Sequence, residues 1–261
     1  KDVGAEDLAV ALRKITLTRN ALVVLCGSAL RNVGIGALLD AVVSYLPSPL
    51  ERPPVTGIDP KTGAAVERGP DPAAPFAALA FKTTFDKNAG LLTWLRIYSG
   101  TIRGGDAVLI EPKHSKERIG RVYLPDAGDR EGIDEAPAGS VVCVTGLGGV
   151  RTGETIADPK APIALESIRV PDAVVSIVIE PKTASDRDRL GPSLAKLLAC
   201  DPSLRSSVDS ETGQTVLSGM GRLHLEIAVA SLEDDYGVSL NTGKPRVAYR
   251  TTIARPVTVS Y

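Results

Sequence analysis

The chain has 261 residues, enough for one large or two medium domains, and its hydrophobic content of 43% is sufficient for well-packed cores. The formal net charge of −1, from 30 basic and 31 acidic residues, excludes a general attraction to nucleic acid, so any RNA contact must be local. The three cysteines lie far apart, which excludes a disulfide framework and a Cys/His metal site.

The first part of the chain predicts a helix, a buried strand and a second helix. A helical stripe of leucine and isoleucine runs through residues 5–18, and the apolar run from Ala21 to Cys26 is typical of a buried strand. A second amphipathic pattern covers residues 35–46. This order is typical of a parallel α/β domain, and we expect residues 1–48 to be the C-terminal end of one. The rest of its sheet is expected upstream of Lys1, which implies truncation or cleavage there.

The middle of the chain predicts a linker and then a small barrel. Residues 49–74 are rich in proline and are expected to form a semi-extended linker. Residues 75–168 contain several short β-rich runs separated by glycine, asparagine and aspartate turns. Short strands at this spacing predict a closed antiparallel β-barrel.

Residues 169–254 predict an α+β domain, and residues 255–261 are expected to begin another domain. Pro192 disfavours an unbroken first helix, so we expect either a kink there or a helix that starts near it. The order β-α-β-β-α-β is that of the ferredoxin-like split βαβ fold. The expected elements are a strand over 174–179, a helix capped by Ser185 or Asp186, a hairpin of 206–209 with 214–217, a helix over 223–236, and strands over 238–240 and 247–253.

The sequence contains no catalytic constellation. Neither a G-x-x-x-x-G-K-[ST] loop nor a G-x-G-x-x-G turn after a strand occurs, so the chain alone is expected to hold no triphosphate. The loop Cys26-Gly-Ser-Ala-Leu30 follows the predicted strand, where α/β domains bind ligands. It is either a ligand-contacting loop or an ordinary connection.

Two further segments are candidate contact sites. Lys113, Lys116, Arg118 and Arg121 form a basic hairpin, which is either a solvated turn or a contact to a phosphate backbone. The block Gly219-Met220-Gly221 lies between a strand and a helix, where glycines relieve crowding or let a neighbouring domain or ligand approach closely. His224 is expected to be a packed or capped histidine, because no triad partner is visible in the sequence.

These motifs together resemble the elongation factor G family of translational GTPases. The block Ser218-Gly-Met-Gly-Arg-Leu-His-Leu-Glu-Ile227 resembles an element of the family's third domain. Phe81-Lys-Thr, Arg96-Ile-Tyr-Ser-Gly100 and Thr152-Gly-Glu-Thr155 are similar to its second domain. Ser28-Ala-Leu30 resembles the fifth guanine-nucleotide motif. The family usually has Glu where this chain has Arg222, which makes any salt bridge carried over to that position uncertain.

The resemblance implies a multidomain protein: the tail of an α/β GTPase domain, a β-barrel of the domain II type and a ferredoxin-like domain III. The intact protein would couple GTP hydrolysis, with GTP, GDP and Mg²⁺, to movement of tRNA and messenger RNA on the ribosome. The chain itself would lack a cofactor and be inactive alone. The expected partners are ribosomal RNA and a small-subunit protein, for a cytoplasmic monomer that does not span a membrane.

The same resemblance assigns roles to residues of this chain. The backbone of Ser28 and Ala29 would lie against the guanine base, and Leu30 would flank it. The basic hairpin would contact small-subunit ribosomal RNA. Gly219, Met220, Gly221, Arg222 and His224 would face the GTPase domain, in a region that forms part of an inhibitor pocket in the family.

Alternatives remain open on the sequence. Arg96-Ile-Tyr-Ser-Gly-Thr-Ile102 and Glu117-Arg-Ile119 also resemble the mitochondrial-type paralogue that acts in ribosome recycling, and ribosomal protection against tetracycline is a third variant. The alternative from another class is a non-catalytic ribosome- or RNA-binding module, which the missing phosphate loop favours.

Overall fold

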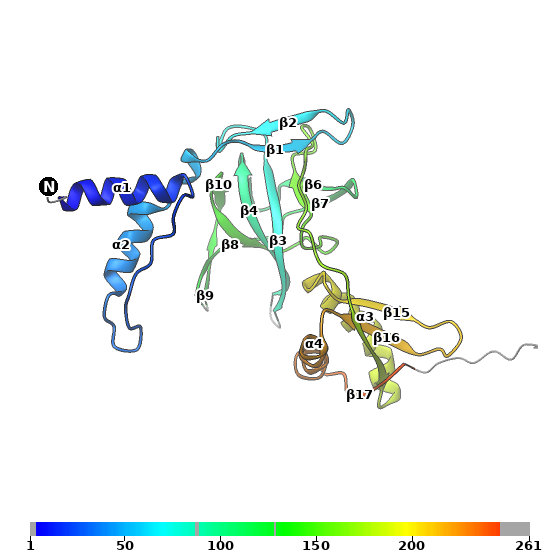
Figure 1. Ribbon diagram of the computed structural model, residues 1–261. Helices are drawn as coiled ribbons and strands as arrows, with labels where there is room; N and C mark the ends of the chain where they lie inside the picture. Colours follow the sequence, from blue (N-terminus) through cyan, green and yellow to red (C-terminus); the bar gives the residue numbers. More distant parts are fainter. Residues whose placement is uncertain (1–3, 87–88, 128, 246–261) are drawn as a thin grey trace, which may run out of the picture. The chain divides into compact units, whose positions relative to one another are not determined.

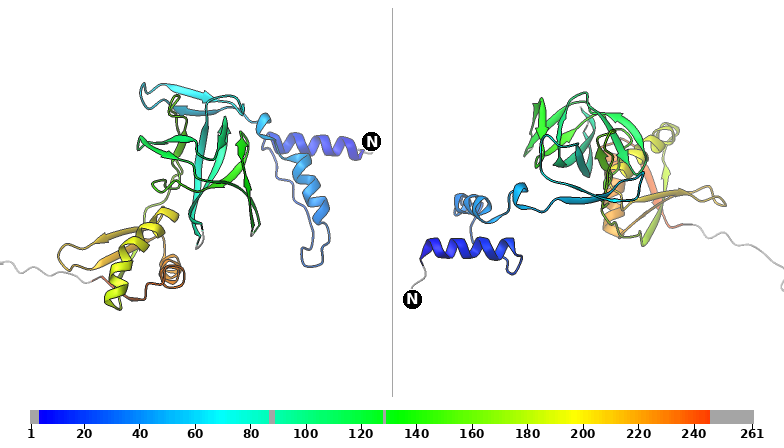
Figure 2. Two further views of the ribbon diagram at one scale, coloured as in Figure 1. Left: turned by 180° about the vertical axis from the view of Figure 1, so that it is seen from behind. Right: turned by 90° about the horizontal axis from the view of Figure 1, so that it is seen from above.

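The computed structural model describes residues 4–86, 89–127 and 129–245. The chain divides into two compact units, Lys1–Pro54 and Val55–Tyr261, shown in Figure 1 and, from two other directions, in Figure 2. The first unit contains α1 (Ala5–Leu17), α2 (Ile35–Tyr45) and a 3-10 turn, η1 (Pro49–Glu51). Both predicted helices are therefore confirmed.

The strand predicted from Ala21 to Cys26 is wrong. Residues 21–27 form no regular secondary structure, and Leu22 and Val24 are exposed. A strand needs a neighbour that pairs with its backbone, and the described residues supply none for this run. Arg13 instead organises the unit: its guanidinium donates to the Ser44 carbonyl at 2.6 Å and pairs with Glu51. Neither helix has a buried residue, so the apolar faces of the unit are uncovered within the described part of the chain.

The second unit begins with strands where a linker was expected. β1 (Val55–Ile58) and β2 (Ala65–Arg68) form a hairpin, and β1 also pairs with β13 (Ala164–Leu165). The linker prediction over 49–74 is therefore wrong for these two strands. The prolines of this segment lie outside the two strands, so they remove no ladder hydrogen bond from them. The apolar residues of this hairpin pack with Ile163 and Leu165 in a small core of their own.

The strands that follow curl into the predicted barrel (Figures 1 and 2). One antiparallel sheet has the order β7-β6-β12-β3-β4-β11-β8-β9, and β5 pairs separately with β10. Alternate residues of these strands, such as Ala78, Leu95 and Ile110, fill a single apolar core. The bounds are β3 (Ala77–Asp86), β4 (Gly90–Ser99), β5 (Thr101–Arg103), β6 (Ala107–Glu111), β7 (Ser115–Arg118), β8 (Val122–Asp126), β9 (Asp129–Ile133), β10 (Glu135–Pro137), β11 (Val141–Val144) and β12 (Thr155–Ala157).

The last described segment has the predicted ferredoxin-like order. Its sheet runs β15-β16-β14-β17, with every pair antiparallel, and both helices share one core with it. The strand expected over 247–253 lies outside the described residues. The domain boundaries given above stay predictions. The bounds are β14 (Val175–Pro181), α3 (Ala184–Cys200), β15 (Arg205–Val208), β16 (Thr215–Gly219), α4 (Arg222–Asp234) and β17 (Leu240–Gly243).

Helix α3 begins earlier than the sequence predicted. Its N-cap is Thr183, whose side chain accepts a hydrogen bond from the Asp186 amide at 3.1 Å, while the Asp186 carboxylate accepts from the Thr183 amide. This capping box starts the helix well before Pro192, which lies inside it. The predictions of a start near Pro192 and of a cap at Ser185 or Asp186 are therefore wrong. The Thr183 cap and the burial of Leu190, Leu194 and Leu197 stabilise the helix by more than the loss of one backbone hydrogen bond at Pro192 costs. The kink stays a prediction.

Replacing Gly100 by alanine should destabilise the barrel severely. Gly100 has φ of +75°, and a Cβ there would lie 2.6 Å from Phe76 Cα and 2.7 Å from the Ala74 carbonyl oxygen. Backbone strain and this clash together should lower the free energy of unfolding by about 3 kcal/mol or more, measured by urea denaturation.

Gly105→Ala is the matched control for this measurement. Gly105 has φ of +90°, and a Cβ there would meet nothing within 4 Å. Only the strain remains, so the expected loss is about 1–2 kcal/mol. Equal losses for the two variants would contradict the proposed clash.

Candidate functional site

The glycine block forms the corner between β16 and α4. A Cβ on Gly219 would lie 2.9 Å from His224 Nδ1 and 3.0 Å from Leu225 Cδ2, so glycine is needed there for close packing. A Cβ on Gly221 would meet nothing within 4 Å, and the extended backbone at this N-cap suits any residue. Crowding therefore accounts for Gly219, whereas Gly221 leaves the surface at the start of the helix open.

His224 connects this corner to a distant loop. The Met220 amide donates to His224 Nδ1 at 3.1 Å, and His224 Nε2 lies 2.7 Å from Asp201 Oδ2. Because Nδ1 accepts a hydrogen bond from the Met220 amide, it carries no proton. The ring proton is therefore on Nε2, which donates a hydrogen bond to Asp201. The prediction of a capped histidine agrees with this geometry, since both ring nitrogens have partners within the domain.

Asp201 is the residue that the sequence did not reveal. It follows the last residue of α3, and its carboxylate also accepts from the Ser203 amide at 2.8 Å and from the Ser203 hydroxyl. Burial opposes ionisation and is the largest single influence, but the hydrogen bonds from Ser203 and His224 together outweigh it and hold the pKa of Asp201 below its usual value. Asp201-Pro-Ser203 has the composition of a turn after a helix, which was the available signal.

Helix α4 presents apolar side chains on two faces. Leu225, Ala228 and Leu232 are buried in the domain core. Leu223 and Ile227, one helical turn apart, are 69% and 57% exposed, and Met220, which precedes the helix, is 47% exposed. We call Met220, Leu223 and Ile227 the α4 stripe. A contiguous exposed apolar set of this kind marks an interaction surface more often than an isolated apolar residue does.

Arg222 is the charged residue of the corner, and its side chain lies at the surface. Its Nε lies 2.9 Å from Glu226 Oε1 one turn along the helix, and both side chains are largely exposed. An exposed pair at this spacing contributes at most about 0.5 kcal/mol. Arg222 therefore stabilises the corner little and remains available at the surface.

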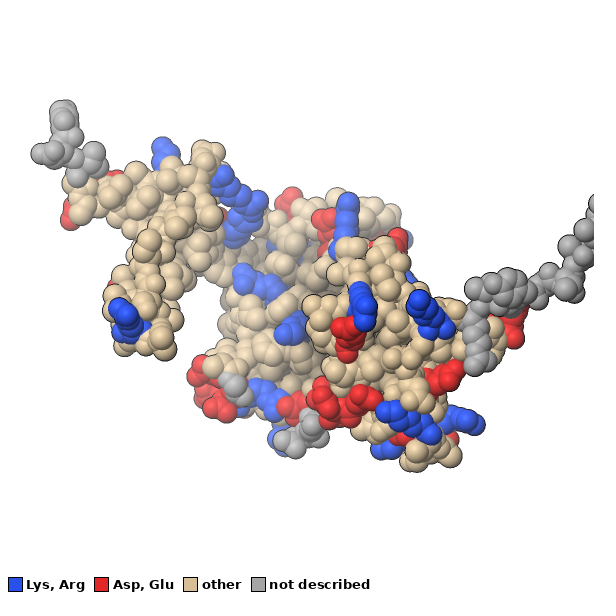
Figure 3. All heavy atoms as spheres, turned by 60° about the horizontal axis from the view of Figure 1, so that its bottom comes forward, with Lys and Arg blue, Asp and Glu red and all other residues tan. Residues whose placement is uncertain are grey.

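The basic hairpin is only partly available for a partner. Lys113 Nζ donates to the Gly149 carbonyl at 2.6 Å and pairs with Glu154 at 2.7 Å, and Arg118 donates to the Gly105 carbonyl at 3.1 Å. Lys116 and Arg121 are exposed, and their side chains form no hydrogen bond or ion pair with the residues that the structure describes. The four predicted cations thus separate into two that brace loops and two that project freely. Figure 3 shows basic and acidic side chains interspersed on the face it draws, so a phosphate contact has to come from such local groups.

The loop predicted to contact guanine is a tight turn. Ser28 donates to and accepts from Val33 at 2.9 and 3.0 Å, and the Ala29 carbonyl accepts from the Asn32 amide at 3.1 Å. Leu30 is 98% exposed. The Ser28 amide is therefore already engaged in the turn, whereas no hydrogen bond within the described residues engages the Ala29 amide.

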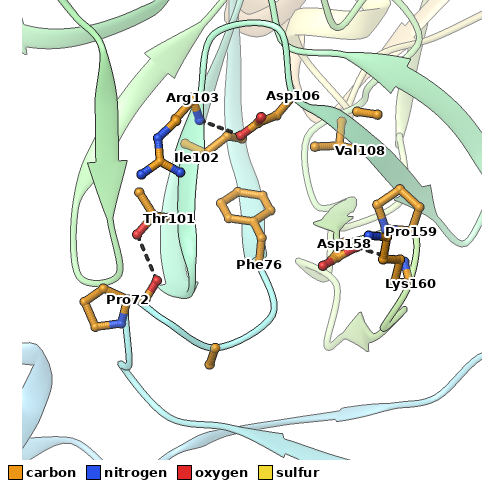
Figure 4. Close-up of a pocket in the computed structure, with 12 residues that line it drawn as sticks. Pro72, Phe76, Thr101, Ile102, Arg103, Asp106, Val108, Asp158, Pro159 and Lys160 are labelled. Carbon is orange, nitrogen blue, oxygen red and sulfur yellow. Dashed lines mark hydrogen bonds between the residues drawn. The ribbon is translucent and has the colours of Figure 1, made fainter.

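One end of the barrel contains a pocket of about 520 Å³ (Figure 4). Phe76, Ile102 and Val108 form its apolar floor. The carboxylates of Asp106 and Asp158 face it, but each caps its own turn by accepting a backbone amide at 2.8 Å. Its twelve lining residues include no histidine, cysteine or serine.

Neither a metal centre nor a membrane span is formed by the described residues. Within residues 4–86, 89–127 and 129–245, no group of three or more His, Cys, Asp or Glu side chains is arranged to hold a metal ion. No helix in the same ranges combines the length and the apolar content needed to cross a lipid bilayer.

Comparison with known proteins gives matches over most of the chain. Residues 75–158 match the family model described as elongation factor G domain 2, and residues 170–244 match elongation factor G, domain III. The chain is 46% identical over 253 residues to elongation factor G of two strains of Dehalococcoides mccartyi, which covers 97% of this chain and 36% of each relative. A crystal structure of a protein from Thermus thermophilus superimposes with a TM-score of 0.72 at 31% identity, over 95% of this chain and 34% of that one.

A barrel followed by a ferredoxin-like domain, with these matches to both, defines a part of a translation elongation factor. The chain belongs to the elongation factor G family and carries its domains II and III. It spans about a third of the length of the curated relatives that it matches, 36% of each.

The free energy of unfolding should depend less on pH in the Asp201→Asn variant than in the wild type. A carboxyl whose pKa is lowered by folding stabilises the native state above its unfolded pKa, about 3.9, and this stabilisation is lost as the pH falls through the folded pKa. The variant should therefore be less stable than the wild type at pH 7, and the gap should narrow below about pH 3.9. Urea unfolding at a series of pH values measures this.

Glu226→Gln serves as the control, because it removes a carboxylate from an exposed pair on the same helix. Its expected effect at pH 7 is within about 0.5 kcal/mol. A constant gap between Asp201→Asn and the wild type at all pH values would contradict the role given to the ionised carboxylate.

Proposed function

We propose that the chain supplies the ribosome-docking barrel and the relay domain of an elongation factor G, and that the whole protein couples GTP hydrolysis to movement of tRNA and messenger RNA on the ribosome. The observation that carries this proposal is the 46% identity over 97% of the chain to proteins named elongation factor G. A cytoplasmic monomer that works on ribosomes fits the same proposal.

The corner at β16 and α4 is proposed as the surface that receives the GTP-binding domain. The α4 stripe is apolar and exposed, and the hydrogen bonds of His224 to Met220 and Asp201 hold the start of the helix in place. A rigid apolar surface of this kind transmits a displacement of one domain to the next with little loss. Gly219, Met220, Gly221, Arg222 and His224 thereby act as a domain interface and not as catalytic groups.

GTP and Mg²⁺ belong to the whole protein in this proposal. The chain has no phosphate-binding loop, and the Ser28–Leu30 turn offers only the Ala29 amide and the Leu30 side chain to a base. We therefore expect the chain to contribute at most one edge of the guanine site and to hydrolyse no GTP alone.

Lys116 and Arg121 are proposed as the barrel's contacts to small-subunit ribosomal RNA. Both are exposed, and their cationic groups are not engaged by other described side chains, so they can approach phosphates without breaking an internal interaction. Lys113 and Arg118 support the same loops from within, through Gly149, Glu154 and Gly105. A ribosomal protein near this RNA would complete the docking surface.

Removing both of these exposed cations should weaken ribosome binding in a salt-dependent way. The Lys116→Ala/Arg121→Ala variant should bind ribosomes more weakly in co-sedimentation. The slope of log affinity against log salt should also fall by about one for each phosphate that the variant no longer binds.

The matched control is Lys61→Ala/Lys160→Ala, which removes two lysines outside the hairpin. It changes the net charge equally and should leave both affinity and slope near the wild-type values. Equal losses for the two double variants would show that only overall charge matters and would contradict the proposed contact.

A further inference from the structure

Two aromatic rings lie in one row across the outer face of the barrel. In the sheet register, Trp94 of β4 is opposite Cys143 of β11, and Cys143 is opposite Tyr123 of β8. Val142 and Val144 point into the barrel core, so Cys143, between them, belongs to the outward side together with both rings. Two strand spacings separate Trp94 from Tyr123, which is about 10 Å.

A β-bulge adds a cation to the end of this row. The register of β3 against β4 shifts between Ala80 and Lys82, so Lys82 and not Phe81 is opposite Trp94. Lys82 Nζ lies 5.8 Å from the centre of the Trp94 ring. Without the extra residue, Lys82 would be one position further along β4 and on the opposite face.

A second cation flanks the other ring. Arg130 Cζ lies 6.0 Å from the centre of the Tyr123 ring, and its guanidinium also pairs with Asp86 at 3.1 Å. The Trp94 indole donates to Thr84 Oγ1 at 3.0 Å, which fixes the orientation of that ring. We call Lys82, Trp94, Tyr123 and Arg130 the aromatic row.

The residues that lie between and beside the two rings are small. Gly132 is opposite Tyr123 on β9, and a Cβ there would meet nothing within 4 Å. Cys143 between the rings is small and fully buried, so it does not itself project beyond Trp94 and Tyr123. Both rings remain partly exposed. The result is a row of two partly exposed rings with a cation over each.

This chemistry suits unpaired nucleotides. Exposed bases stack on aromatic side chains of a sheet, and neighbouring Lys and Arg side chains contact the phosphates between them. A duplex keeps its bases stacked inside the helix and cannot use the rings. The overall charge of −1 makes general electrostatic attraction weak, so the rings should supply much of the affinity.

We propose that the aromatic row binds a short single-stranded segment of RNA by stacking bases on Trp94 and Tyr123, with Lys82 at a phosphate and Arg130, paired with Asp86, supporting the Tyr123 ring. The inference rests on the proposed function in that the ribosome would supply the RNA, and it names a second contact surface on the barrel, separate from Lys116 and Arg121.

The chain offers a direct reporter of this binding, because Trp94 is its one tryptophan. Titration with a single-stranded oligonucleotide of about six uridines or adenosines should quench the intrinsic fluorescence of Trp94. An RNA duplex of equal charge at the same salt concentration should quench it much less. Equal quenching by both would show simple charge attraction and would overturn the proposal, as would no quenching by either single strand.

Substitutions of Tyr123 test the second ring. Tyr123→Leu should weaken oligonucleotide binding about 5- to 150-fold, the effect of losing one stacked base, while Trp94 still reports. Tyr123→Phe keeps the ring and should retain most of the affinity. Tyr45→Leu, in α2, is the matched control and should leave binding unchanged. If Tyr123→Leu binds as tightly as the wild type, the row is not the site.

Ribosome co-sedimentation in parallel keeps the two proposals apart. A chain that binds ribosomes but not single-stranded oligonucleotides overturns the aromatic row and leaves the proposed function intact. A chain that binds oligonucleotides through Tyr123 but does not bind ribosomes supports the row and contradicts the proposed function. Unchanged circular dichroism of each variant confirms that a loss of binding is not a loss of fold.

Discussion

The hydrogen-bonded connection from Met220 through His224 to Asp201 is the constraint on which the functional corner depends. It joins the turn after β16 to the loop after α3, two segments that are far apart in sequence. One ring satisfies a backbone amide on one side and a carboxylate on the other, and Gly219 gives the ring the space it needs. A half-buried polar network in which both ring nitrogens have partners favours one arrangement of its segments.

The barrel illustrates a second means of placing function, which is the register of a sheet. A single bulge in β3 brings Lys82 beside Trp94, while the residues before it keep Ala78 and Ala80 in the core. The position of each single cation matters here, because a chain with a net charge of −1 has no general attraction for anions. The basic hairpin follows the same logic, because Lys113 and Arg118 brace loops and Lys116 and Arg121 project from them.

Periodic signals predicted most elements, and contacts between distant segments were the part that sequence could not supply. The helix over 222–234 has length and no internal breaker, so its pattern was sufficient. The run from Ala21 to Cys26 was apolar enough for a strand, but strand formation depends on a partner. Residues 49–74 contain a hairpin because their prolines flank the two strands and leave the ladder hydrogen bonds intact. At the site, the corner was predicted from its glycines, whereas Asp201 was not, because nothing local links it to His224.

The tautomer of His224 tests this account most directly. The chain has two histidines, so ¹⁵N spectra of the histidine-labelled protein contain few signals, and His114→Gln assigns those of His224. At pH 8 we expect a protonated Nε2 and an unprotonated Nδ1, because Nδ1 accepts a hydrogen bond from the Met220 amide. Asp201→Asn should loosen this preference. A protonated Nδ1, or a mixture of both tautomers in the wild type, would contradict the account.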